Sequence, residues 1–221
     1  MFYDALENQH GLKHDPWKSL AVPRPIGWIS TVSSDGVANL APYSFFNAIA
    51  DRPHYVCFGS GGMKDTLRNI EQTKEFVCNI ANYELRDHMN MSSAAVPYGV
   101  DEFPLSGLTA AKSNLVKPPR VKEAPASFEC RHFQTIALPG AGKYKSSYHL
   151  VIGLVVGIHI DDRYIKDGLI DTATMKPIAR LGYMDYAVVT PETMFEITRP
   201  DVGPDGQIIS TKPEKWDGQY R

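Results

Sequence analysis

Residues 39–47 read NLAPYSFFN and combine strand-forming aromatic residues with a proline. Pro42 has no N–H group to donate to a sheet ladder, so the sequence predicts that a strand breaks or bulges here. A break leaves the neighbouring N–H and C=O groups free to face a ligand. An irregular edge strand with aromatic core residues is an equally good interpretation. The side chains available for ligand contacts around the break are Tyr43, Ser44, Phe45 and Asn47.

The residues before this stretch predict a hairpin. Residues 25–34 read as a strand, Ser34-Asp35-Gly36 as a turn, and residues 37–41 as the returning strand. In residues 24–31, RPIGWIST, prolines set the entry to the first strand, and Gly27 permits close backbone approach. Taken alone, this segment fits a barrel strand with one buried tryptophan better than a ligand-binding segment.

A glycine loop follows the next predicted strand, residues 54–58. Residues 59–70 read GSGGMKDTLRNI, which predicts a strand end, a tight turn and the start of a helix. A helix N-terminus presents unpaired N–H groups and Lys64 adds a full positive charge, so the loop suits a phosphate group. The Walker pattern fails because Met63 precedes the lysine and Asp65 follows it. A glycine turn before a surface helix capped by Asp65 is an equally good interpretation.

Strand patterns dominate the rest of the chain. With two or three short helices and no regular alternation of strands and helices, the sequence argues against a doubly wound parallel sheet. It predicts a mainly β fold, a closed or partly closed antiparallel barrel with helical insertions. The further predicted elements are strands over 75–80, 127–138 and 147–161, helices over 64–72 and 83–92, and a long irregular connection over 93–126.

The strand over 147–161 is the longest, and its two faces differ. One face carries Gly153 and Gly157, so we expect a ligand or another subunit to approach it closely. His149 shares that face and is either a polar contact beside a ligand or a histidine satisfied within the barrel. We expect one domain over residues 1–198 and a polar arm or tail over residues 199–221.

Composition excludes several classes of function. The formal net charge of −2 and the lack of a basic run argue against nucleic acid as a main partner. No apolar run is long enough to cross a bilayer, and residues 1–20 lack the pattern of a signal peptide. Three cysteines without a Cys-x-x-Cys spacing predict free thiols in a reducing compartment, so we expect a cytoplasmic protein. We predict no metal site.

Several segments together resemble the flavin reductase-like, FMN-binding split-barrel family, which includes flavoredoxin-type proteins. The resemblance spans roughly residues 18–195, is most specific in the first half and does not cover the tail. The matching pieces are RPIGWISTVSSDG (24–36), NLAPYSFFN (39–47), KDTLRNI (64–70), EFVCNIA (75–81), HLVIGLVVGIHIDD (149–162) and IARLGYMDY (178–186).

The resemblance implies a homodimeric split barrel that binds FMN near the dimer interface. It implies that one group of residues lies along the ribityl chain and ring: Trp28, Ile29, Ser30 and Thr31. A second group would meet the edge of the isoalloxazine ring: Pro42, Tyr43 and Ser44, with Asn47 nearby. A third would hold the phosphate: Ser60, Lys64, Asp65 and Thr66. Arg180 and Tyr183 would complete the site. We expect Asp65 to cap the helix or to orient Lys64.

The function that the resemblance implies is an NAD(P)H-dependent flavin reductase, which transfers hydride to flavin N5. Electrons would pass to a second flavin, to oxygen or to a partner oxygenase. Because the flavin carries the chemistry, no side-chain acid or base is expected, and His149 is a candidate contact on the nicotinamide side. The alternatives are an FMN electron carrier of flavoredoxin type and a small-molecule-binding barrel without flavin. The intact phosphate and ring-edge motifs argue against the last of these.

Overall fold

The computed structural model describes residues 1–209. Its contacts divide the chain into a unit of Met1–Val189 and a second unit that begins at Thr190. The helices are α1 (Trp17–Leu20), α2 (Asp65–Thr73), α3 (Arg86–Met91), α4 (Glu102–Leu105) and α5 (Thr172–Met175), with 3₁₀ helices η1 (Asp162–Tyr164) and η2 (Pro191–Thr193).

The strands are of very different lengths. They are β1 (Arg24–Pro25), β2 (Gly27–Val32), β3 (Ala38–Tyr43), β4 (Phe46–Ala50), β5 (Tyr55–Gly61), β6 (Glu75–Ile80), β7 (Ala110–Ala111), β8 (Arg120–Val121), β9 (Ala126–Ala137), β10 (Tyr148–Ile160), β11 (Ile165–Lys166), β12 (Leu169–Ile170), β13 (Ile178–Arg180), β14 (Tyr186–Val188), β15 (Asp201–Val202) and β16 (Ile208–Ile209).

The main sheet is antiparallel throughout and has the strand order β3-β2-β6-β9-β10-β5-β4. Its two edge strands, β3 and β4, are consecutive in the chain and are joined only by Ser44 and Phe45. Because such a short link cannot cross a flat seven-stranded sheet, the sheet must curl until its edges meet. The predicted mainly β, partly closed barrel is therefore confirmed, and the predicted break falls directly after Tyr43.

Close contacts hold this seam together, where the two edges of the sheet meet. The Gly59 N–H of β5 donates to the Phe45 carbonyl of the link at 2.8 Å. Gly27 of β2 lies under the Phe46 ring of β4, so closely that a Cβ atom on Gly27 would lie 2.4 Å from Phe46 Cδ2. Gly27 does permit a close approach, but the group that approaches is the side-chain ring at the start of β4 rather than the predicted backbone.

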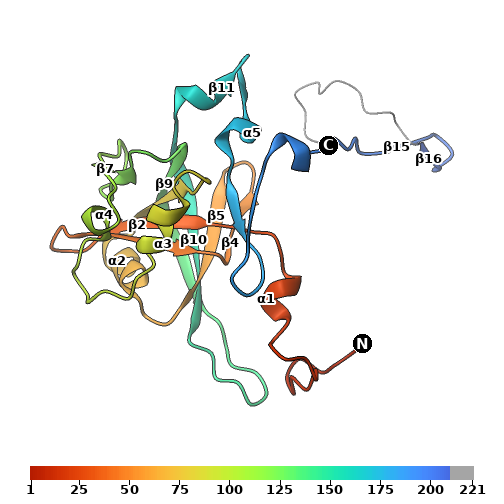
Figure 1. The fold of residues 1–221 in the computed structure, drawn as a ribbon, viewed down its shortest axis with the longest axis horizontal. Helices are drawn as coiled ribbons and strands as arrows, with labels where there is room; N and C mark the ends of the chain where they lie inside the picture. The colour runs from red at the N-terminus through yellow and green to blue at the C-terminus, as the bar shows by residue number, and fades with distance from the viewer. Residues whose placement is uncertain (210–221) are drawn as a thin grey trace. The chain divides into compact units, whose positions relative to one another are not determined.

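Three helices cover one part of the barrel. The helix α2 contacts β2 and β3, and α3 and α4 also contact β3 (Figure 1). Leu67 and Ile70 of α2 are fully buried, as the sequence predicts. The helix α3 is shorter than the prediction over 83–92, because the Asn82 side chain accepts the Leu85 N–H at 3.1 Å and holds a turn before the helix.

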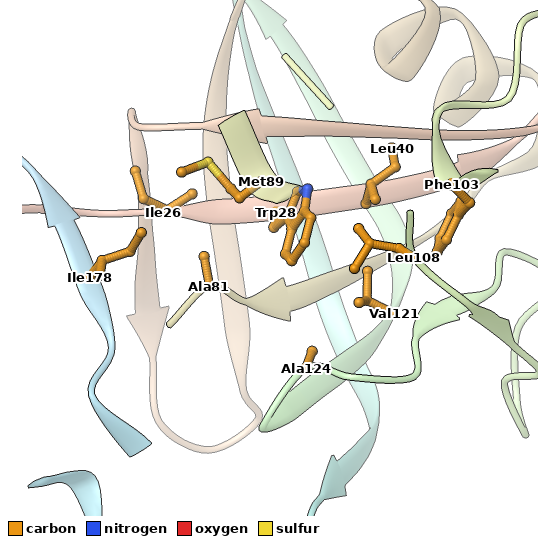
Figure 2. Packing of buried hydrophobic residues seen from close by; sticks show 10 residues of the cluster. All are labelled: Ile26, Trp28, Leu40, Ala81, Met89, Phe103, Leu108, Val121, Ala124 and Ile178. Carbon is orange, nitrogen blue, oxygen red and sulfur yellow. The ribbon is translucent and has the colours of Figure 1, made fainter. Parts of the chain in front are cut away.

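One of the two hydrophobic clusters is built around Trp28. Its indole is fully buried and donates from Nε1 to Ser92 Oγ at 2.9 Å. Figure 2 shows the ring among side chains of the barrel, of α3 and of the connection over 93–126. The residues that the connection contributes are Phe103, Leu108, Val121 and Ala124. The connection has little regular structure, as predicted, but it forms part of the core.

Glu129 of β9 anchors this connection to the barrel. Its buried carboxylate accepts the N–H groups of Asn114 at 2.7 Å, Leu115 at 2.5 Å and Val116 at 3.2 Å, and it also bonds His159 Nε2. Burial works against the charged carboxylate, but these bonds outweigh it and hold the pKa of Glu129 below its ordinary value. An irregular segment thereby obtains partners for its buried backbone groups.

The glycines of β10 are approached by the chain itself. A Cβ atom on Gly153 would lie 2.2 Å from Phe76 Cζ, and one on Gly157 would lie 3.4 Å from Leu115 Cδ1. The expectation that a ligand or another subunit approaches them is therefore wrong. Phe76 occupies the space over Gly153, where no larger residue fits.

Three further expectations concern the thiols, membrane segments and the tail. Cys57, Cys78 and Cys130 are free. Within residues 1–209, no helix is both long and apolar enough to cross a membrane. In the predicted tail over 199–221, β15 and β16 pair with each other, and residues 210–221 lie outside the described residues. The contacts divide the chain after Val189, not at the predicted domain boundary of residue 198. That boundary stays a prediction.

We expect Gly27→Ala to destabilise the protein by about 1–3 kcal/mol, because the added methyl group forces the Phe46 ring out of the seam. Chemical unfolding in urea measures the loss. Gly157→Ala is the matched control, since its new Cβ atom meets neighbours at ordinary contact distance. Equal stability of the two variants would contradict the close packing at the seam.

We expect Glu129→Gln to lower the free energy of unfolding at neutral pH by about 2 kcal/mol, since the charged acceptor of several N–H groups is lost. A carboxylate with a lowered pKa stabilises the fold above its unfolded pKa and loses this effect as the pH falls through the folded value. The difference between the two proteins should therefore shrink below about pH 4.5. Unfolding curves across pH test this, and a difference that stays constant into acid would contradict it.

Candidate functional site

A cleft of about 610 Å³ opens at the seam of the barrel. Its walls come from the β3–β4 link, the end of β5, the start of α2, the hairpin β13–β14 and the N-terminal segment. Six of the predicted site residues line it: Pro42, Tyr43, Ser44, Lys64, Arg180 and Tyr183. Members of three predicted groups thus meet in one cavity. They come from the ring-edge group, from the phosphate group and from the pair Arg180 and Tyr183.

One wall of the cleft carries the N-terminus of α2. Lys64 is the N-cap residue, it has an extended backbone, and its side chain makes no capping bond. The N–H groups of the first turn are therefore not satisfied by the N-cap side chain. Gly59 and Gly61 line the cleft beside Lys64. Uncapped N–H groups together with an ammonium group make a binding site for a phosphate or another anion.

Asp65 does not cap the helix, and the alternative that it orients Lys64 stays a prediction. It is the first residue of α2 rather than its cap, and its carboxylate pairs with Arg68 one turn later, with Oδ1 3.4 Å from Arg68 Nη1. The expectation that Asp65 caps the helix is wrong, because Lys64 occupies that position. The pairing with Arg68 directs the carboxylate along the helix, and Asp65 is not among the residues that line the cleft.

Aromatic side chains line another part of the cleft. Tyr43 packs against Phe58 with ring centroids 4.7 Å apart, and burial raises the pKa of its hydroxyl. Phe45 lies edge-on to Tyr148, with ring centroids 6.1 Å apart. The Tyr148 side chain is 40% exposed. Such rings offer flat apolar surfaces to a planar ligand.

Two arginines face each other beside these rings. Arg24 of β1 and Arg180 of β13 are directly opposed in the ladder between these strands. Arg180 lies over the Tyr186 ring, with Cζ 4.6 Å from its centroid, and it also bonds the Tyr183 carbonyl. Burial and the neighbouring Arg180 lower the pKa of Arg24. With Lys18 and Lys64, this cleft carries a marked excess of positive charge over its carboxylate, Asp15.

Residues 28–31 are not among the residues that line the cleft. Trp28 and Ile29 belong to the two hydrophobic clusters. Ser30 is buried and donates from Oγ to the Pro119 carbonyl at 2.5 Å. Thr31 Oγ1 accepts one N–H from the Asn39 amide at 3.2 Å and one from the Asn69 amide at 3.1 Å. Their predicted contact with a ribityl chain stays a prediction, while their side chains stabilise the fold.

Four further predicted residues do not line the cleft. Ser60 is buried and donates to the Gly62 carbonyl at 3.3 Å, and Thr66 Oγ1 accepts from the Asn39 amide at 3.0 Å. Asn47 Oδ1 accepts the Ala48 N–H. His149 bonds the Ser147 carbonyl through Nδ1. Because successive side chains of a strand point to opposite faces, Tyr148 lines the cleft and its neighbour His149 does not.

Sequence reasoning missed several residues of the cleft. Arg24 and Tyr186 stand inside the quoted motifs without being predicted as ligand contacts. Phe45, which we predict as a ligand contact beside the strand break, does line the cleft. Asp15, Lys18 and Tyr148 carry no local signal, since tertiary packing alone brings the N-terminal segment and β10 to the seam. The remaining missed residues are Ile26, Met89, Ser93 and Leu181, whereas Gly59 and Gly61 belong to the glycine loop that we predict as a phosphate site.

A second hollow of about 450 Å³ adjoins the cleft, and Met89, Arg180 and Tyr186 line both. Tyr83 and Arg86 form part of its wall, with the Arg86 guanidinium 4.2 Å from the centre of the Tyr83 ring. Among residues 1–209, no group of three or more His, Cys, Asp or Glu side chains has an arrangement that would hold a metal ion.

This chain is similar to known proteins in sequence. The family model described as flavin reductase like domain matches residues 19–178. An uncharacterized protein of Aquifex aeolicus is 37% identical over 186 residues, which cover 80% of this chain and 90% of the relative.

Solved structures share the same fold. Nitrilotriacetate monooxygenase component B from Bacillus cereus superposes with a TM-score of 0.80 and 31% identity, over 89% of this chain and 98% of that one. Flavoredoxin of Desulfovibrio vulgaris (Miyazaki F) superposes with a TM-score of 0.70 and 20% identity, over 80% of this chain and 91% of that one. At that identity, flavoredoxin supports the fold alone.

We expect Thr31→Val to destabilise the protein by about 1–3 kcal/mol, because it keeps the shape of the side chain but leaves buried amide donors without their acceptor. Thr31→Ser retains the hydroxyl and is the matched control. Urea unfolding distinguishes the two variants. If both variants lose the same free energy of unfolding, the Thr31 hydroxyl does not stabilise the fold as acceptor of the two amide groups.

Proposed function

The chain belongs to the flavin reductase like domain family, and from that premise we propose that it binds FMN in the seam cleft and reduces flavin with NAD(P)H. The observation that carries the proposal is the joining of an anion site and an aromatic cavity in one cleft. FMN needs both, since it has a phosphate at one end and a planar ring at the other.

The residues present fit this cofactor. Lys64 and the first-turn N–H groups of α2 would hold the phosphate. Pro42, Tyr43 and Ser44, at the break between two strands, would meet the ring edge. Arg180 and Tyr183 would close the site from the hairpin β13–β14. The cleft volume of about 610 Å³ lies within the usual range for small-molecule sites.

Bound FMN would supply hydride chemistry at N5, so the chain itself needs no acid or base there. What the side chains supply is binding, orientation and exclusion of water. The adjoining hollow offers space for the nicotinamide donor, because Met89, Arg180 and Tyr186 form a wall common to both cavities. Positioning of two reactants side by side contributes much of the rate in such transfers.

An electron acceptor outside this chain belongs to the same proposal. Nitrilotriacetate monooxygenase component B, at 31% identity, is one part of a monooxygenase. We infer that this chain passes reducing equivalents to a partner oxygenase or to another acceptor. The three free thiols agree with a reducing, cytoplasmic location.

A homodimer completes the proposal. The outer face of β10 carries apolar side chains that its own chain leaves partly uncovered, among them Leu150, Ile152, Leu154 and Ile158, the last 51% exposed. A row of such residues is typical of a surface that another chain covers. A second copy of this chain is the occupant that the family resemblance implies.

We expect Lys64→Ala to weaken FMN binding by about tenfold to a hundredfold, the usual loss for a hydrogen bond to a charged group. Riboflavin, which has no phosphate, should bind almost as before. Lys74→Ala is the matched control, because Lys74 follows the other end of the same helix and pairs with Glu71. Fluorescence titration measures both ligands. Equal losses for FMN and riboflavin would refute Lys64 as the phosphate contact.

We expect anaerobic mixing of the FMN-loaded protein with NADH or NADPH to bleach the flavin absorbance. Bleaching by either nucleotide supports the reductase. If neither bleaches a flavin that is bound, the electron carrier of flavoredoxin type is the better account. A protein that does not take up FMN at all would contradict both and leave the small-molecule-binding barrel.

A further inference from the structure

We propose that the N-terminal segment over residues 14–21, here called the strap, forms a wall of the flavin cleft and that Arg24 holds it there as a positioning residue. The proposal rests on the function proposed above, because the ligand of the cleft is taken to be FMN. Figure 1 shows α1, the helix within the strap, beside the turn that follows β13.

Arg24 joins the strap to that turn. Its side chain is 9% exposed, and Nη1 donates to the Lys18 and Ala21 carbonyls at 2.6 Å each. Nη2 donates to the Leu181 carbonyl at 2.8 Å. A planar guanidinium can serve several acceptors in fixed directions, which an ammonium group cannot do in the same way. Two segments far apart in the sequence are thus tied to one side chain.

The strap also packs directly on the turn. A Cβ atom on Gly182 would lie 2.0 Å from Ser19 Oγ and 2.8 Å from Ser19 Cα, so the strap backbone lies against the glycine. The His14 and Tyr183 rings meet edge-on, with centroids 5.9 Å apart. These contacts fix the strap at the position where Asp15 and Lys18 line the cleft.

Beyond these contacts, the strap has a single buried residue, Pro16, which precedes α1. The helix α1 has only four residues, none of them buried, and Trp17 is 60% exposed. A helix this short is not stable by itself. Its order therefore depends on the contacts with Arg24 and Gly182 rather than on a core of its own.

The charges of this wall connect the strap to an anionic ligand. Arg24 and Arg180 oppose each other in the β1–β13 ladder, and like charges in opposed positions destabilise a sheet. Within residues 1–209, neither arginine has a carboxylate within ion-pair distance. An anion in the cleft would offset this repulsion, so FMN and the ordered strap should stabilise each other.

Hydrogen exchange of the full chain, with and without FMN, tests the proposal. In Arg24→Lys we expect amides of the strap to exchange about tenfold faster in the ligand-free protein, and FMN and riboflavin to bind about tenfold more weakly. Lysine keeps the positive charge at this position, so weaker binding of uncharged riboflavin reports loss of the wall rather than loss of a charge or of the phosphate contact. In the unaltered protein, FMN should slow exchange in the strap.

Two further variants keep the test decisive. Gly182→Ala displaces Ser19 without altering Arg24, so it should release the strap in the same way and serves if Arg24→Lys does not fold. Lys18→Ala keeps the main-chain carbonyl that Arg24 binds and should leave exchange in the strap unchanged.

Unchanged exchange of the strap in both Arg24→Lys and Gly182→Ala would overturn the role of Arg24. Faster exchange with unaltered flavin affinity would overturn the role of the strap as a wall. If the unaltered chain binds no FMN, the proposed function fails together with the ligand part of this proposal, whereas the ligand-free exchange rates still decide the role of Arg24.

Discussion

The two-residue link between β3 and β4 is the constraint on which the rest of this structure depends. These strands are the opposite edges of a seven-stranded sheet, yet only Ser44 and Phe45 separate them. The sheet has to curl until its edges meet, and Gly27 admits the Phe46 ring where they do. A cleft lies at this seam because regular ladder pairing ends there, and the residues of the link become part of its lining.

Buried polar side chains attach the irregular parts of the chain to this barrel. Glu129 binds the N–H groups of the connection around Leu115, and Arg24 binds carbonyls of the strap. Asn79 Oδ1 accepts the Val121 N–H at 2.9 Å, and Glu102 accepts the Leu40 N–H at 2.9 Å. Each of these side chains supplies a hydrogen-bond partner for a backbone group, as a neighbouring strand does in a regular sheet. These segments, among which the strap lines the cleft, are thereby held in defined positions.

Local patterns predict the strands of the main sheet except β4, the hairpin closed by Ser34-Asp35-Gly36 and the helix α2, because alternation and turn chemistry are local properties. The cleft is predictable where a backbone feature marks it, as at Pro42 and Lys64. Trp28 and Thr31 illustrate the limit, since their motif matches the family while their side chains face the core and a buried hydrogen-bond network. Lys18 shows the opposite case, because only the packing of distant segments brings it to the cleft.

The central claim is that one cleft holds the phosphate of FMN at the N-terminus of α2 and the flavin ring at the seam. A crystal structure of the full chain with FMN tests it most directly. The account predicts phosphate oxygens within hydrogen-bond distance of Lys64 and the first-turn N–H groups of α2, with the ring edge beside Pro42 and Tyr43. Phosphate bound instead between Arg24 and Arg180, or FMN bound outside the seam, would contradict it.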